Sequence, residues 1–168
     1  DITKLTWMNG CYIRNLSETD FHQLALPYYK DLENKNMDLA FLSKVLQPRI
    51  EVLNQITEQT DFLAKMPEYD IALYENKKMK TNPEIAAKAL NLVLPVLESV
   101  GDWTNENLFN TLKETAVANE MKNGQILYPV RIALSGKETT PGGATELAHI
   151  LGKDETLRRI KAALAKLA

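Results

Sequence analysis

The sequence has little of the chemistry that metal sites and catalytic triads need. It contains one cysteine, Cys11, and two histidines, His22 and His149, among 168 residues. One cysteine cannot form an internal disulfide, and no His/Cys set has the spacing of a structural zinc site. Two isolated histidines are a poor basis for an acid–base pair. We therefore expect no metal ligands, no catalytic residues and a reducing compartment.

Long apolar runs and phosphate-loop motifs are also missing. No segment approaches the roughly 20 apolar residues that span a bilayer, and the opening residues lack the basic and apolar regions of a signal peptide. Pro141-Gly142-Gly143 has no Gly-Lys-Ser/Thr ending and is interpreted as a turn. We expect a soluble cytoplasmic protein with no membrane partner. Because residue 1 is Asp rather than Met, we expect a piece excised from a longer protein.

The residues that are present favour a folded domain with an uneven charge distribution. Hydrophobic residues make up 45% of the chain, enough for a real core, and the net charge is -2. Residues 1–120 hold 12 Lys and Arg against 18 Asp and Glu, whereas residues 121–168 hold 8 against 4. This asymmetry is compatible with a localised RNA-facing surface, although a solvated helical face gives the same count.

Apolar residues recur at intervals of three and four along most of the chain, which is the period of amphipathic helices. We predict an all-α fold of two packed helical subdomains without an extensive sheet. The polar stretch 75–82 before Pro83 is typical of a boundary, so the subdomains are placed at 1–80, including an N-terminal connector, and at 81–168. The apolar segment around Pro129 is predicted to be a short buried helix.

Capping and turn residues predict where helices begin and end. Ser17 predicts the start of a helix over about 18–30 that is interrupted at Pro27. Further caps are expected from the small and polar residues at helix ends: Gly101 after a helix over 83–100, Thr104 before one over about 105–120, Gly152 after one through Leu151, and Asp154 before the last.

Two other segments are predicted from proline and glycine. Asn9-Gly10 predicts a turn in a connector over residues 1–16 with an aromatic anchor. Pro48 predicts that one helix ends near Leu46 or Gln47 and that another begins at about Pro48. Arg49 would then lie at a helix entrance, beside free backbone N–H groups that suit phosphates or base edges.

Single residues with reactive or stacking side chains can have structural roles instead of functional ones. We interpret His149 as a satisfied core or boundary histidine, His22 as a surface helix residue and Cys11 as a buried thiol rather than a reactive one. Aromatic rings can stack on unpaired bases, but at this spacing core packing is the commoner role. The aromatic residues concerned are Trp7, Tyr12, Tyr28 and Tyr29.

Three stretches resemble, in order and spacing, the region that follows the catalytic domain in bacterial-type glutamyl-tRNA synthetases. They are Lys4–Arg14 with Leu16-Ser17; Gln47-Pro48-Arg49; and Tyr128–Gly136 with Thr140-Pro141-Gly142, Leu151-Gly152-Lys153 and Leu157–Ile160. The resemblance covers essentially the whole chain. It departs from the family pattern at Gly143, where the family often has a large apolar residue.

The resemblance implies the C-terminal anticodon-binding domain of a class I aminoacyl-tRNA synthetase. Such a domain recognises the anticodon loop of tRNA(Glu) for glutamate–tRNA ligation in protein biosynthesis, while a parent catalytic domain on the N-terminal side uses ATP. The family's His-Ile-Gly-His-type and Lys-Met-Ser-Lys-type motifs are absent here, so no cofactor is expected in this chain. Carried over by position, Arg49 would read a base of the anticodon, and Arg131 and Thr140 would contact the anticodon nucleotides. Lys137, Arg158 and Arg159 are candidate contacts to the tRNA backbone.

Other roles remain open for these residues and for the chain. Arg49 has Glu51 and Glu58 as acidic neighbours, Arg131 is suited to solvating an apolar segment, and Thr140 is also an ordinary turn residue. The alternative functions are a helical protein–protein interaction module without nucleic-acid binding and a small independent enzyme. Steep salt dependence of binding would distinguish RNA from an apolar protein partner.

Overall fold

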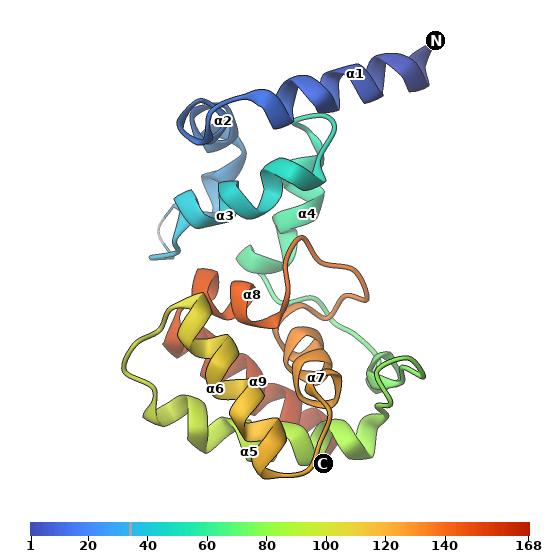
Figure 1. Cartoon of the computed structure of the whole chain (residues 1–168), viewed down its shortest axis with the longest axis vertical. Coiled ribbons are helices and arrows are strands. Elements are labelled where there is room, and N and C mark those ends of the chain that lie inside the picture. The colour runs from blue at the N-terminus through green and yellow to red at the C-terminus, as the bar shows by residue number, and fades with distance from the viewer. Residues whose placement is uncertain (34) are drawn as a thin grey trace. The chain divides into compact units, whose positions relative to one another are not determined.

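The computed structural model describes residues 1–33 and 35–168, which form α-helices and short 3₁₀ helices in two compact units, Asp1–Lys65 and Met66–Ala168 (Figure 1). In this described part of the chain, the β pairing is limited to one isolated bridge between Asn76 and Thr81. The predicted all-α fold is confirmed. Among these same residues, no helix combines the length and the apolar character needed to cross a bilayer.

The first unit is a small helical bundle. Its elements are α1 (Ile2–Asn15), α2 (Glu18–Ala25), η1 (Leu26–Leu32), α3 (Leu39–Leu46), η2 (Gln47–Arg49) and α4 (Gln55–Ala64). Ser17 caps α2 as predicted, since its hydroxyl accepts the Asp20 N–H at 3.1 Å. The chain changes to 3₁₀ geometry at Leu26, just before Pro27. Large side chains at most 1% exposed form the core of this unit: Phe21, Tyr29, Leu42, Leu46, Ile56 and Phe62.

The predicted turn at Asn9-Gly10 is wrong, because both residues lie inside α1. The Asp1 carboxylate caps this helix by accepting the Thr3 N–H at 2.9 Å. Gly10 is buried, and a Cβ there would lie 3.2 Å from Cγ of Glu51, so the glycine serves close packing rather than a turn.

The predicted aromatic anchor in the first segment is not found either. In Figure 1 the N-terminal half of α1 extends beyond the other helices of its unit. Trp7 and Tyr12 are 62% and 63% exposed, so neither ring is part of the core of this unit. Further exposed apolar side chains on the same helix are Ile2, Leu5 and Met8.

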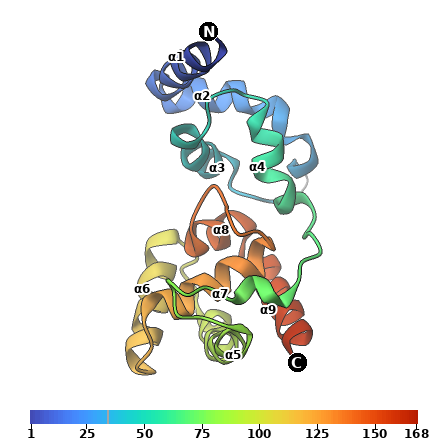
Figure 2. The same cartoon turned by 90° about the vertical axis from the view of Figure 1, so that its right-hand side faces the viewer.

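The second unit is built around one central helix, α7 (Asn123–Ser135). The elements around it are η3 (Ile71–Tyr74), α5 (Pro83–Ser99), α6 (Asn105–Ala118), α8 (Ala144–Leu151) and α9 (Lys153–Leu167). All five pack against α7, and Figure 2 shows it between α8 and α5. Ile126, Val130 and Ile132 of α7 have no exposed surface. The predicted buried helix around Pro129 is confirmed.

Along the chain, the boundary between the two compact units lies between Lys65 and Met66, earlier than the predicted division near residue 80. Residues 71–80 belong to the second unit because hydrogen bonds fasten them to α7. The Tyr128 hydroxyl donates to the Leu73 carbonyl at 2.8 Å, and Nε2 of Gln125 donates to the Lys80 carbonyl at 3.0 Å. The polar composition of 75–82 therefore marks an anchored turn and not a linker.

Of the four caps predicted in the second unit, two are wrong and two are confirmed. Helix α5 ends with Val100 as its C-cap, not Gly101, and Nζ of Lys153 donates to the Val100 carbonyl at 2.6 Å. Gly152, at φ 84°, is the N-cap of α9, so Asp154 lies in the first turn instead. Thr104 caps α6 by accepting the Asn107 N–H at 3.3 Å, and Gly152 also ends α8, both as predicted.

Candidate nucleic-acid interface

Arg49 lies at the end of the 3₁₀ turn η2, not at the start of a helix. Helix α3 ends at Leu46 as predicted, but the next α-helix begins only at Gln55, and Ile50 between them is extended and has no exposed surface. The exposed Arg49 side chain turns back along α3, and Nη1 donates to the Val45 carbonyl at 2.6 Å. Arg49 therefore satisfies a carbonyl at the end of α3 and displays its remaining donors to solvent.

In the second unit, the structure brings the predicted residues Arg131 and Thr140 together. Nη1 of Arg131 donates to the Thr140 hydroxyl at 3.0 Å and to the Lys137 carbonyl at 3.5 Å, while Nη2 donates to the Glu138 carbonyl at 2.7 Å. The Thr140 hydroxyl donates in turn to the Gly142 carbonyl at 2.6 Å. Arg131 thus pins the loop that follows α7.

The Arg131 guanidinium is half-buried, and burial lowers its pKa. Tyr128 and the Glu138 carboxylate act in the opposite direction, and the guanidinium lies 5.4 Å from the centre of the Tyr128 ring. An arginine stays charged through such a shift. Within the described residues three of its N–H groups have acceptors, so Nε and one hydrogen on Nη2 remain to bind a ligand.

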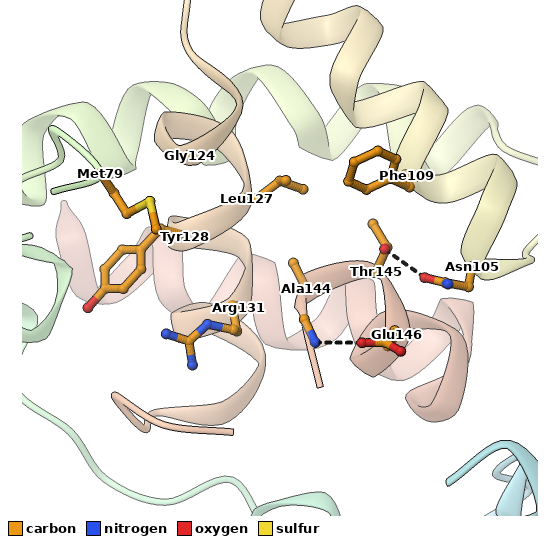
Figure 3. A pocket seen from close by; sticks show the side chains of 11 residues that line it. Met79, Asn105, Phe109, Gly124, Leu127, Tyr128, Arg131, Ala144, Thr145 and Glu146 are labelled. Atoms are coloured by element: carbon orange, nitrogen blue, oxygen red, sulfur yellow. Dashed lines mark hydrogen bonds between the residues drawn. The ribbon is translucent and has the colours of Figure 1, made fainter. Parts of the chain in front are cut away.

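An open pocket of about 500 Å³ lies beside this arginine. Figure 3 shows Tyr128 and Arg131 on one side of it and Phe109 on the other, with Leu127 between them. Polar groups from Asn105 and from the start of α8 complete its lining: the Thr145 hydroxyl and Asn105 Oδ1 are 2.7 Å apart, and the Glu146 carboxylate accepts the Gly143 N–H at 2.9 Å. The pocket suits a flat group with apolar faces and polar edges.

The three predicted backbone contacts differ in exposure. Arg159 is only 3% exposed; Nη1 donates to the Leu134 carbonyl at 2.7 Å, and Nε pairs with the Glu155 carboxylate at 2.7 Å. It holds α9 against α7 and is not displayed to a phosphate, so this prediction is not supported. The Arg158 side chain is 63% exposed although it also pairs with Glu155, at 2.6 Å. Lys137 is half-buried in the pinned loop.

The hydrogen bonds and exposure of the two histidines and the cysteine can be compared with their predicted roles. Nδ1 of His149 lies 3.0 Å from the Trp103 carbonyl, as expected of a satisfied boundary histidine. His22 is half-buried and 2.7 Å from the Ser43 hydroxyl, so it is not a plain surface residue. Cys11 is partly exposed rather than buried. No group of three or more potential metal ligands gathers in residues 1–33 or 35–168.

Sequence reasoning missed part of this region. Phe109 and Met79 line the pocket but lie in segments predicted only as a helix and a boundary. A run of three lysines, Lys77, Lys78 and Lys80, flanks Met79 and was interpreted as part of the boundary. The feature that marks this run is its density of positive charge. The charge count over residues 1–120 hid it, because acidic residues outnumber basic ones in that part of the chain.

These features define the class of the second unit: a helical binding domain in which a loop pinned by an arginine borders an open pocket with apolar and polar walls. A protein-family model described as an anticodon binding domain matches residues 20–164. The chain belongs to this family. The match includes segments of both units, and the predicted relationship to the anticodon-binding region of glutamyl-tRNA synthetases is confirmed.

Similar proteins include the glutamate–tRNA ligases of Clostridium tetani, 50% identical over 167 residues, and Clostridium acetobutylicum, 49% identical over 168 residues. Each alignment covers 99% of this chain but only 34% and 35% of the two ligases, so the chain spans about a third of their length.

Solved structures with a similar fold have lower sequence identity. A glutamate tRNA ligase from Elizabethkingia meningosepticum matches 97% of the chain with a TM-score of 0.78 at 20% identity, and that match covers 32% of the ligase. The glutamate-tRNA synthetase from Elizabethkingia anophelis matches 95% with a TM-score of 0.73 at 19% identity, over 31% of that chain. At such identities the likeness shows the fold.

Proposed function

We propose that this chain recognises the anticodon loop of a glutamate tRNA and supplies that recognition to a glutamate–tRNA ligase. The observation that carries the proposal is the Arg131–Thr140 pair beside an open pocket in a chain of the anticodon binding domain family. Single-stranded RNA loops are read by splaying bases onto aromatic or guanidinium planes and hydrogen-bonding their edges. The pocket offers both kinds of group, from Phe109 and Tyr128 and from Arg131.

Arg49 provides a second candidate base contact from the first unit. Its guanidinium is exposed and keeps several N–H donors beyond the one given to Val45. A planar fork of donors is suited to pairing with acceptor atoms on the edge of a base or with a phosphate. We assign Arg49, Arg131 and Thr140 to the anticodon and the exposed Arg158 and the half-buried Lys137 to the tRNA backbone.

The ligation itself is proposed to occur in a catalytic domain that uses ATP and precedes this region, in a longer cytoplasmic protein. Two observations support a further domain. The relatives of this chain are about three times as long, since the alignments cover 34% and 35% of them. Helix α1 exposes Leu5, Met8 and Tyr12 at helical spacing, which suits packing against another domain.

Salt dependence of binding to a glutamate tRNA transcript tests the proposal. RNA binding through phosphate contacts should weaken steeply as salt rises, because Lys and Arg side chains that neutralise phosphates release counterions from the RNA. A helical protein-interaction module would bind an apolar partner with little salt dependence and would ignore the transcript. Absence of transcript binding at low salt would contradict the proposed function.

A further inference from the structure

The segment 76–81 is a rigid turn that carries a concentrated positive charge. Asn76 and Thr81 exchange backbone hydrogen bonds of 3.1 and 3.0 Å, and the Asn76 side chain accepts the Met79 N–H at 2.9 Å. Lys77, Lys78 and Lys80 are all exposed in this turn. Since the turn is already closed by its own hydrogen bonds, displaying these ammonium groups to a ligand costs little backbone ordering.

One amide group joins this turn to the start of α7. The Gln125 side chain donates through Nε2 to the Lys80 carbonyl at 3.0 Å and accepts the Lys122 N–H through Oε1 at 3.0 Å. The backbones of Lys80 and Lys122 are therefore neighbours, and exposed Lys122 adds a fourth ammonium group. We call Lys77, Lys78, Lys80 and Lys122 the lysine cluster.

The charges of the lysine cluster are not neutralised inside the domain. In residues 1–33 and 35–168 no ion pair involves any of the four lysines, and the acids nearest in sequence, Glu75 and Glu120, are themselves exposed. The cluster also lies at the N-terminal end of the 13-residue helix α7, whose dipole favours anions there. Unpaired like charges held together repel one another, so this arrangement suits a polyanionic ligand.

The cluster is continuous with the pocket that contains Arg131. Met79, between the lysines, lines the pocket together with Gly124 of α7 (Figure 3). A Cβ on Gly124 would lie 2.7 Å from Sδ of Met79, so the missing side chain allows the turn to pack against the helix. A strand that places a base beside Arg131 can therefore extend its backbone along the wall that carries the lysines.

We propose that the lysine cluster binds the phosphodiester backbone of the tRNA strand on the side of the pocket formed by Met79. The inference rests on the proposed function for the identity of the RNA, but it concerns a separate contact. The lysine cluster contributes affinity that is the same for every RNA sequence, because it neutralises phosphates. Arg49 and Arg131 are instead assigned to base recognition.

A charge-removing variant tests the contact. Lys77→Gln, Lys78→Gln and Lys80→Gln are combined in the full chain, and a matched control combines Lys30→Gln, Lys113→Gln and Lys161→Gln, three exposed lysines on separate elements. Anisotropy titrations use anticodon-arm RNAs with the glutamate anticodon and with a changed anticodon, between 50 and 200 mM salt. Circular dichroism melting confirms that both variants are folded.

The cluster variant should bind both RNAs at least ~10-fold more weakly at low salt and should lower the slope of log affinity against log salt by about 2, since each single-strand phosphate contributes about 0.7. The control should keep most of the wild-type slope. Unchanged affinity and slope in the cluster variant, with base preference intact, would overturn this contact and leave the proposed function standing.

The reverse outcome separates the two proposals. A reduced slope in a chain that has no base preference would support the phosphate contact and contradict anticodon recognition. No RNA binding by the wild-type chain would overturn both. Vesicles of phosphatidylcholine with phosphatidylserine provide the remaining comparison. Lysine-dependent binding to these vesicles, with RNA affinity unchanged in the cluster variant, would overturn the RNA contact and show that the cluster binds a lipid surface.

Discussion

The Thr140 hydroxyl accepts a 3.0 Å hydrogen bond from Nη1 of Arg131 and donates a 2.6 Å bond to the Gly142 carbonyl. One threonine therefore couples the central helix α7 to the loop before α8. The pair is useful for testing because the hydroxyl can be removed without changing the size of the side chain.

Replacing Thr140 by Val should lower the free energy of unfolding by about 1 kcal/mol, because the Gly142 carbonyl and one Arg131 N–H lose their partner. RNA affinity should fall with it, because the guanidinium is then held only by its hydrogen bonds to the Lys137 and Glu138 carbonyls. Urea denaturation and RNA titration measure the two effects. Thr139→Val, at an exposed neighbour in the same loop, is the matched control; equal effects of the two substitutions would contradict a specific role for Thr140.

Arg49→Ala should weaken discrimination at one anticodon base by roughly 1–3 kcal/mol, because a forked donor pairs with one base edge. Titration of RNAs that differ at single anticodon positions locates that base. Arg14→Ala removes an exposed arginine from the same unit and serves as the control. If Arg49→Ala weakens all RNAs equally, the arginine is a backbone contact; if it weakens none, only its bond to Val45 remains as its role.

Glu155 should make the stability of the chain sensitive to acid. Hydrogen bonds from Arg158 and Arg159 outweigh burial and lower the pKa of Glu155 from its ordinary 4.5 to about 2. Because the folded pKa is depressed, the carboxylate stabilises the fold above about pH 4.5, and this contribution is lost as the pH falls towards 2.

The substitution Glu155→Gln tests this coupling. At neutral pH it should lower the free energy of unfolding by about 2 kcal/mol, since the buried Arg159 loses a charged partner. The melting temperature of the Glu155→Gln variant should also depend less on pH between 4.5 and 2 than that of the wild type. Asp154→Asn, an exposed acid in the same helical turn, controls for net charge. Parallel pH profiles for wild type and Glu155→Gln would rule out the coupling.

Lys80 should show a conflict between stability and binding. It has φ 59°, a left-handed conformation that costs an L-residue about 1 kcal/mol and glycine almost nothing. Lys80→Gly should therefore stabilise the fold by up to about 1 kcal/mol while weakening RNA binding. Thermal melts and RNA titrations compare it with Lys80→Asn, which tolerates this conformation and also lacks the charge. Destabilisation by Gly would contradict the strain assigned to this backbone position. Unchanged RNA affinity in both variants would contradict the role of the Lys80 ammonium group in RNA binding.

Much of the fold follows from local sequence signals. The Ser17 and Thr104 caps, the interruption of the first predicted helix near Pro27, the end of α3 near Leu46 and the helix around Pro129 were all predicted. Each depends on a backbone preference or a periodic apolar pattern that acts within a few residues. The resemblance also indicated Arg131 and Thr140, which the structure shows in contact.

The remaining errors arise where distant residues decide the conformation. Asn9-Gly10 has the composition of a turn, but Gly10 lies inside α1, where a Cβ would come within 3.2 Å of the Glu51 side chain. Val100 rather than Gly101 caps α5, and Lys153, far along the chain, satisfies carbonyls at this helix end. Composition likewise cannot separate the buried Arg159 from the exposed Arg158, although they are adjacent in sequence.

The most direct test of anticodon recognition is a titration of the chain with two anticodon-arm RNAs in dilute buffer, one carrying the glutamate anticodon and the other identical except for its three anticodon bases. If the chain reads the anticodon, both RNAs should bind measurably through phosphate contacts, and the RNA with the glutamate anticodon should bind clearly more tightly. Equal affinity for the two RNAs, or no binding to either, would contradict anticodon recognition.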